Sequence, residues 1–105
     1  MTDGPALDIA PEREADRLVL RLRGDVDMAA ADILTAALGR AVTEPVHEVV
    51  VDLADVGFLD STGIRVLLEG RERAQDRGIV VTARDPQPLV LNVLRITSVA
   101  ELFGL

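Results

Sequence analysis

The sequence predicts a single α/β domain in which helices flank a mixed β-sheet of four or five strands. Short apolar segments typical of strands alternate with segments of helical periodicity, and one central run is apolar at every position. The 105 residues suffice for one hydrophobic core. Helices between strands favour right-handed parallel crossovers, so the later strands should be parallel. We expect residues 1–5 to be disordered and residues 6–105 to form the domain.

Two strands are expected at the start of the domain, joined as a hairpin. Residues 6–10 form a short, weakly apolar segment that Pro11 should end, and residues 12–16 read as a polar turn. In residues 18–23, leucines alternate with valine and arginine, which is the period-2 pattern of a half-exposed strand. The first strand should therefore add an antiparallel edge to the sheet.

The first helix and the central strand follow. Asp27 is a good N-cap for a helix from Met28 to about Thr43, because its side chain can accept a hydrogen bond from the first turn. Pro45 prevents the helix from continuing. Residues 47–53 contain three consecutive valines, a run that predicts a central strand covered on both faces.

The remaining elements complete the order β-β-α-β-α-β-α. After a loop over residues 54–60, a second helix should start near Ser61 or Thr62 and end at Gly78, a typical residue just beyond a helix C-terminus. Residues 79–83 form another buried strand. A last helical region then follows, in which three leucines can close the core: Leu91, Leu94 and Leu102.

The composition narrows the possible functions. A net charge of −7 repels phosphate backbones and anionic lipid, so a protein with a basic patch is a better partner than nucleic acid or a membrane. All 11 basic residues are arginines, which excludes mechanisms that need a lysine, such as P-loop phosphate binding. Cysteine is absent, and neither a signal peptide nor a membrane-spanning apolar run is expected. We therefore expect a cytoplasmic protein.

The most informative segment joins the central strand to the second helix. Asp60-Ser61-Thr62-Gly63 delivers a hydroxyl to the first turn of a helix, where unpaired N–H groups and the helix dipole favour negative charge. A phosphate on Ser61 would add about −1.5 to −2 charge without breaking the helix. The alternative is that Ser61 is simply the N-cap, and on spacing alone this alternative is favoured.

Four blocks follow one another at matching intervals: Gly24-Asp25-Val26-Asp27, Val50-Val51-Asp52-Leu53, Phe58 to Ile64, and Leu94-Arg95-Ile96-Thr97. Together they resemble the STAS family, specifically the bacterial anti-sigma-factor antagonists. The resemblance covers about residues 7–105, and the Asp-Ser-Thr-Gly block is its most specific part. It implies a mixed sheet flanked by helices and a binding module that is not an enzyme.

The resemblance also implies a partner-switching cycle. The unphosphorylated antagonist binds an anti-sigma factor that is also a serine kinase, and so frees a sigma factor. Phosphorylation of the serine dissociates the complex, and a serine phosphatase restores it. By position the phosphoacceptor is Ser61, and the partner-binding residues are Asp25, Asp27, Asp60, Ser61, Thr62, Gly63, Ile64 and Arg65. No catalytic, cofactor-binding or metal-binding residue is implied, and the protein is expected to be a monomer or a weak dimer.

Three residues depart from the family pattern. Ser98 stands where a glycine is common, so the turn after the last helix should differ. Arg65 puts a positive charge one turn from Ser61, within reach of a phosphate or an acidic partner. Asn92 is polar in an otherwise apolar helix. None of them alters the phosphoacceptor, so they bear on the identity of the partner.

Three other functions fit parts of the sequence. A receiver-like domain would use Asp52 as its phosphoacceptor, but such domains need a lysine, and Asp52 suits a loop-capping role better. A hydrolase could hold a metal with Asp25, Asp27 and Asp60, which follow no recognisable ligand spacing. If this hydrolase instead used a Ser-His-Asp mechanism, it would have to use His47, expected at the far end of the sheet from the serine. A STAS scaffold without phosphorylation stays open.

Overall fold

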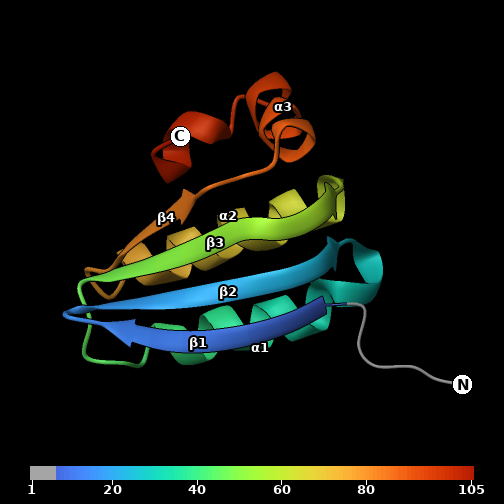
Figure 1. Cartoon of the computed structure of the whole chain (residues 1–105). Coiled ribbons are helices and arrows are strands. Elements are labelled where there is room, and N and C mark those ends of the chain that lie inside the picture. Colours follow the sequence, from blue (N-terminus) through green and yellow to red (C-terminus); the bar gives the residue numbers. More distant parts are fainter. Residues whose placement is uncertain (1–6) are drawn as a thin grey trace, which may run out of the picture.

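The computed structural model describes residues 7–105 as a four-stranded sheet with helices behind it and along one edge (Figure 1). The strands lie in the order β1 (Leu7–Glu14), β2 (Arg17–Val26), β3 (Glu48–Leu59) and β4 (Val80–Arg84). β1 and β2 are antiparallel, whereas β2, β3 and β4 are parallel. The helical elements are η1 (Met28–Ala30), α1 (Ala31–Ala41), α2 (Ser61–Gln75), α3 (Pro88–Ile96) and η2 (Ala100–Phe103). The predicted fold class and element order are confirmed. The expectation for residues 1–5 lies outside the described residues.

The hydrophobic core lies between the sheet and the helices. Alternate residues of β2 enter it, as the period-2 pattern predicts: Leu18, Leu20 and Leu22. From α1 and α2, the largest contributors are Leu34, Leu38 and Leu67, each at most 2% exposed. Burying one such side chain stabilises the fold by roughly 1.5–3 kcal/mol. Of the three leucines expected to close the core, Leu102 was wrongly assigned, because it is 43% exposed and its neighbour Phe103 is buried instead.

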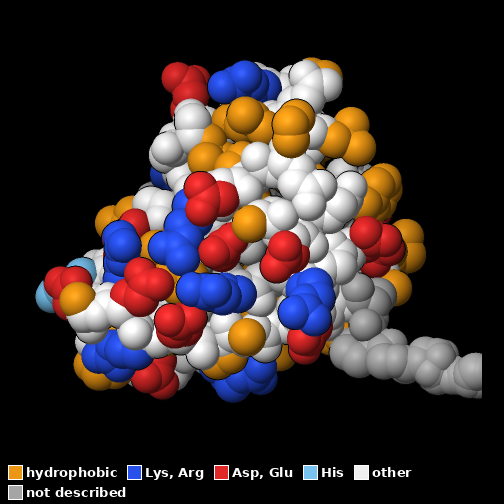
Figure 2. All heavy atoms as spheres, in the orientation of Figure 1, with side chains coloured by type: hydrophobic (Ala, Val, Ile, Leu, Met, Phe, Trp, Pro, Cys, Tyr) orange, Lys and Arg blue, Asp and Glu red, His pale blue; other side chains and the backbone are white. Residues whose placement is uncertain are grey.

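The opposite face of the sheet is covered by charged side chains (Figure 2). Val19 and Val50 pair across β2 and β3 on this face, yet they are only 0% and 3% exposed. Ion pairs surround them and link all four strands: Arg21 with Glu12, Arg17 with Glu14 and Glu48, and Arg84 with Glu14 and Asp52. The aliphatic stems of such side chains can shield apolar surface. The predicted two-sided burial of the central strand is therefore confirmed, with ion pairs covering one side.

Arg84 pairs with two carboxylates on this charged face. Its guanidinium lies 3.3 Å from the carboxylate of Asp52 and 3.6 Å from that of Glu14. Burial acts to lower the pKa of Arg84, but the two carboxylates outweigh it and raise the pKa above its ordinary value. Arg84 thus joins the two edge strands of the sheet, β4 and β1, across its charged face.

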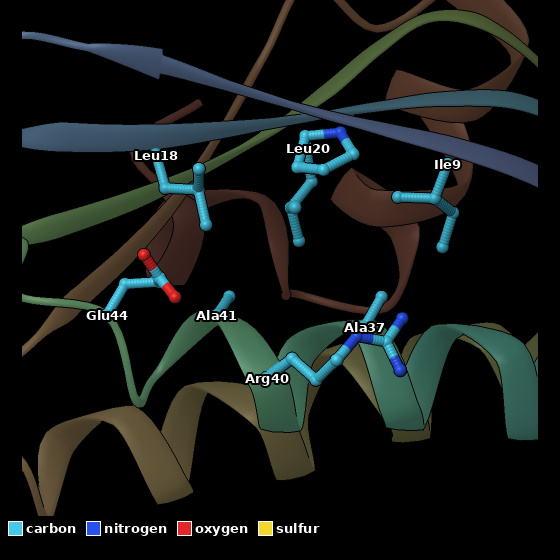
Figure 3. A pocket seen from close by; sticks show the side chains of 8 residues that line it. Ile9, Leu18, Leu20, Ala37, Arg40, Ala41 and Glu44 are labelled. Atoms are coloured by element: carbon cyan, nitrogen blue, oxygen red, sulfur yellow. The ribbon is translucent and has the colours of Figure 1, made fainter.

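An apolar cleft of about 300 Å³ opens between the edge of β1 and α1 (Figure 3). Leu18 and Leu20 point from the sheet toward Ala37 and Ala41 of the helix, whose small side chains leave space between the two layers. This cleft lies under the antiparallel edge of the sheet and belongs to a different region from the β3–α2 junction.

Both strands of the hairpin are longer than predicted. β1 continues through Pro11 to Glu14, and a two-residue turn, Ala15-Asp16, replaces the expected turn over residues 12–16. Proline lacks a backbone N–H, but an edge strand tolerates it because one side of that strand has no hydrogen-bonded neighbour. The prediction that Pro11 ends the strand is therefore wrong.

The expected loop over residues 54–60 is also wrong, because β3 runs to Leu59 and pairs with β2 throughout. Val56 pairs with Gly24, and Leu59 pairs with Val26. The register shifts twice along this pair, which is the signature of β-bulges. Bulges break the alternation of buried and exposed residues, and this hid the second half of the strand in the sequence.

Two helix boundaries differ from the prediction. Asp27 is an N-cap as predicted, but it caps the short 3-10 turn η1, and α1 follows at Ala31 and ends at Ala41. The second helix ends at Gln75, three residues before Gly78, which has a φ of +72°. Gly78 thus provides the left-handed residue of the turn that leads into β4.

Candidate functional site

The candidate site lies where β2 and β3 end side by side. Asp25 pairs with Phe58 in the register of the two strands, and the Asp60 N–H donates to the Val26 carbonyl oxygen at 3.3 Å. Because β2 and β3 are parallel, the segments that follow them leave the sheet at the same end. The structure therefore brings Asp25 and Asp27, from one strand end, next to Asp60 and the residues that begin α2.

Asp60 is the N-cap of α2 and immediately precedes the helix. Its backbone is extended, with φ −110° and ψ −175°, and its carboxylate accepts a hydrogen bond from the Gly63 N–H at 2.9 Å. Ile64 N–H donates to the Asp60 carbonyl oxygen at 3.0 Å and closes the first helical turn. The alternative in which Ser61 serves as the N-cap is therefore wrong, because that role belongs to Asp60.

Ser61 is the first residue of α2, and it is exposed. Within residues 7–105 its hydroxyl makes no hydrogen bond to another residue. Thr62, one residue further into the helix, is half-buried. Ser61 thus has an accessible hydroxyl without a capping role, whereas access to Thr62 is more restricted.

Gly63 brings the start of α2 against the end of β2. A Cβ on this residue would lie 2.4 Å from the carbonyl oxygen of Val26 and 2.8 Å from a methyl group of Leu59. Real contacts do not come this close, so glycine is required by the approach of the two segments. Gly63 is buried and Ile64 is 8% exposed, and both residues therefore shape the site from beneath.

Charges around Ser61 are mostly negative. Asp25 is exposed, whereas Asp27 is half-buried and accepts a hydrogen bond from the Ala30 N–H at 3.2 Å. Arg65 is exposed and pairs with Glu69, with 3.2 Å between Nη1 and Oε2. Within residues 7–105, no three His, Asp or Glu side chains are grouped so as to hold a metal ion.

Two exposed apolar residues beside the site were not among the predicted site residues. Phe58 is 47% exposed and Leu89, at the start of α3, is 63% exposed. Together with Leu59, Val90 and Val93 they line an apolar hollow of about 130 Å³. Phe58 begins the block from Phe58 to Ile64 and lies two residues before Asp60, and this position is the signal that could have revealed it.

The residues of two rival functions, the receiver-like domain and the Ser-His-Asp mechanism, lie apart from this site. Asp52 lies inside β3, so the loop that it was expected to cap is absent. Its carboxylate accepts a hydrogen bond from the Ala54 N–H at 3.0 Å and pairs with Arg84. His47 is exposed and immediately precedes β3, whereas Ser61 follows the other end of that strand. Across residues 7–105, the helices are too short or too polar to cross a membrane.

Comparison with known proteins identifies the family. Residues 9–104 match the family model described as "Mlab, STAS domain". The chain belongs to the STAS domain family. A STAS-domain containing protein of Pseudomonas aeruginosa (strain UCBPP-PA14) is 26% identical over 98 residues, which cover 93% of this chain and 96% of that protein. The family resemblance predicted from the sequence is confirmed.

Solved structures extend the likeness to anti-sigma factor antagonists. One from Mycobacterium paratuberculosis has a TM-score of 0.82 and 25% identity, over 99% of this chain and 88% of that chain. The anti-sigma factor antagonist SpoIIAA in its unphosphorylated form has a TM-score of 0.78 and 20% identity, over 90% of this chain and 84% of that chain. The STAS domain described here thus has the fold of these antagonists.

Proposed function

We propose that this STAS domain is an anti-sigma-factor antagonist switched by phosphorylation of Ser61. The unphosphorylated form binds an anti-sigma factor that is also a serine kinase, and a sigma factor is released. The kinase then phosphorylates Ser61, the complex dissociates, and a serine phosphatase restores the binding form. One observation carries the proposal: Ser61 is exposed at the first position of α2, while Asp60 provides the cap.

The separation of cap and hydroxyl makes modification compatible with the fold. A dianion near a helix N-terminus is favoured by roughly 0.3–1 kcal/mol, and repulsion from the Asp60 carboxylate opposes it by a comparable amount. The hydrogen bond from Gly63 to Asp60 does not involve the Ser61 side chain and can persist after phosphorylation. The phosphate would therefore change the surface of the domain and leave its stability nearly unchanged.

The same phosphate would be costly inside an interface. A charge that loses water without gaining a partner costs several kcal/mol, and each 1.4 kcal/mol lowers affinity tenfold. Asp25, Asp27 and Asp60 already make this end of the sheet acidic, so the partner should present basic groups to it. We propose that the exposed members of the predicted set, Asp25, Ser61 and Arg65, contact the partner directly. As a binding module for a sigma-factor regulator, the protein would act in the cytoplasm and need no enzymatic activity of its own.

A second candidate is a STAS-type scaffold without a phosphorylation switch. What supports it is that residues 9–104 match the "Mlab, STAS domain" family and that 93% of the chain is similar to a STAS-domain containing protein of Pseudomonas aeruginosa. In that case the same end of the sheet would bind a partner constitutively, and Ser61 would serve only as an exposed polar residue of the interface.

Phosphorylation by the serine kinase encoded nearest to the gene separates the two candidates. The purified protein is incubated with this kinase and ATP, and its intact mass and phosphopeptides are measured. We expect one added phosphate on Ser61, none on Ser61→Ala, and an unchanged level on the matched control Thr62→Ala. A phosphate on Thr62, Thr97 or Ser98 with Ser61 unmodified would contradict the switch, and no phosphate at all would favour the scaffold.

A further inference from the structure

We propose that the Arg65 guanidinium binds the phosphate of phosphorylated Ser61. To do so, it leaves its present partner Glu69. The inference rests on the proposed phosphorylation of Ser61 and names the residue that holds the phosphate. The three residues are spaced four apart on α2, so their side chains follow one stripe of the helix surface. All three are exposed, and the guanidinium can reach either neighbour without repacking the core.

The present ion pair holds Arg65 weakly. Its guanidinium lies 3.2 Å from the Glu69 carboxylate, but the two side chains are 60% and 51% exposed. Water and salt screen a pair that is this exposed. In pairs four residues apart, the favoured order puts the acidic residue N-terminal to the basic one, in agreement with the helix dipole. Arg65 and Glu69 stand in the reverse order.

A phosphate on Ser61 would offer Arg65 the favoured order. The phosphate would lie N-terminal to Arg65 at the same spacing, with about −1.5 to −2 charge against the single charge of Glu69. Side chains on a helix also tilt toward its N-terminus, which is the direction from Arg65 to Ser61. The planar guanidinium can donate two parallel hydrogen bonds to phosphate oxygens. Order, charge and direction all favour the exchange.

The surroundings of Ser61 make Arg65 the natural counter-ion. The carboxylates that face this helix start are Asp60 on the same element, and Asp25 and Asp27 from the adjoining end of β2. All three repel a phosphate. Arg65 is the only basic residue between positions 61 and 69. By moving to the phosphate it would offset part of this repulsion and leave the Glu69 carboxylate unpaired on the surface.

The move of Arg65 from Glu69 to the phosphate predicts how substitutions shift the pH at which the phosphate titrates. Phosphoserine is inserted at position 61 of the full chain during synthesis, and its ³¹P chemical shift is followed between about pH 4 and pH 8. A nearby cation stabilises the dianion, so Arg65→Gln should raise the midpoint by about 0.2–0.4 pH unit. Glu69→Gln should lower the midpoint, because it removes the competitor for Arg65.

A double variant shows whether Glu69 acts through Arg65. Glu69 lies about 12 Å from Ser61 along the helix axis, beyond the screening length at physiological salt. Salt largely screens its direct effect, so Arg65→Gln/Glu69→Gln should nearly match Arg65→Gln alone. Arg77→Gln and Glu72→Gln remove the same charges further along the chain and serve as controls that leave the midpoint unchanged.

Two results would overturn the exchange. If the phosphate titrates at the same pH in the phosphoserine-61 protein with and without Arg65→Gln, Arg65 does not hold the phosphate. A shift on Glu69→Gln that persists without Arg65 would show that Glu69 acts directly. Failure of a kinase to modify Ser61 would instead refute the proposed function and leave this test intact, because the phosphoserine is inserted without a kinase.

Discussion

Two helical segments begin at the same end of the sheet with the same capping device. Asp27 begins η1 and Asp60 begins α2, each from extended backbone. Each carboxylate accepts a hydrogen bond from the N–H three residues later, at 3.2 Å from Ala30 and 2.9 Å from Gly63. An apolar residue, Met28, follows the first cap, whereas a serine follows the second. At the start of α2, Asp60 therefore caps the helix, and the hydroxyl of the following residue, Ser61, is accessible for modification.

The two residues whose N–H groups donate to these caps, Ala30 and Gly63, differ in how they pack. Ala30 fits into the core with 0% exposure, whereas a Cβ at Gly63 would lie 2.4 Å from the carbonyl oxygen of Val26. The start of α2 therefore approaches β2 more closely than a side chain allows. This approach fixes the position of Ser61 relative to the strand end that carries Asp25. The comparison thus separates three roles at the β3–α2 junction: cap, close packing and accessible hydroxyl.

The largest loss of stability is expected where Gly63 at the start of α2 packs against the end of β2. Gly63→Ala should lower the free energy of unfolding by about 3 kcal/mol, because a backbone carbonyl and two side chains must move to admit the methyl group. The matched change Ala30→Gly should cost about 1 kcal/mol, mainly through backbone entropy. Denaturant unfolding of both variants measures the difference. Equal losses would mean that the two starts do not differ in packing.

A smaller effect is expected from each cap. Asp60→Ala and Asp27→Ala should each lower the free energy of unfolding by about 1 kcal/mol, because one N–H in the first turn loses its partner. Thermal and denaturant unfolding of the two variants provide the measurement, with Asp25→Ala, an exposed aspartate on the same sheet end, as control. A loss on Asp27→Ala alone would show that α2 does not depend on Asp60.

The smallest effect on stability is expected at Ser61. Ser61→Ala should change the free energy of unfolding by less than about 0.5 kcal/mol, because the side chain is exposed and does not cap the helix. Phosphorylation should leave the melting temperature within a few degrees, since attraction to the helix dipole and repulsion from Asp60 nearly cancel. Differential scanning calorimetry decides this. Loss of cooperative unfolding in the phosphoprotein would mean that phosphate acts by melting the domain.

Local patterns in the sequence were enough to predict the order of the elements and the position of the serine. Alternating leucines identified β2, and three consecutive valines identified β3. Asp27 was recognised as a cap because capping depends on residues only three apart. The STAS resemblance rested on blocks that the family match confirms over residues 9–104.

The missed features depend on contacts between distant residues. Pro11 looked like a strand end because the sequence does not show that β1 lies at an edge. Residues 54–59 looked like a loop because bulges interrupt their alternation. Gly63 was assigned to the partner surface, and only the structure shows its approach to Val26. Aspartate and serine are both common N-caps. The structure was therefore needed to show that Asp60, and not Ser61, caps α2.

The binding affinity of the phosphoprotein tests the central claim most directly. Titration calorimetry against the cognate anti-sigma factor would compare the unmodified protein, Ser61→Ala, Ser61→Asp and the protein phosphorylated on Ser61. We predict that Ser61→Ala binds like the unmodified protein and that phosphorylation weakens binding at least tenfold, a loss of about 1.4 kcal/mol or more. Ser61→Asp should be intermediate, because aspartate carries less charge and fewer oxygens than phosphoserine. Equal affinities of the phosphorylated and unmodified proteins would contradict the account and leave Ser61 as an exposed residue without a switching role.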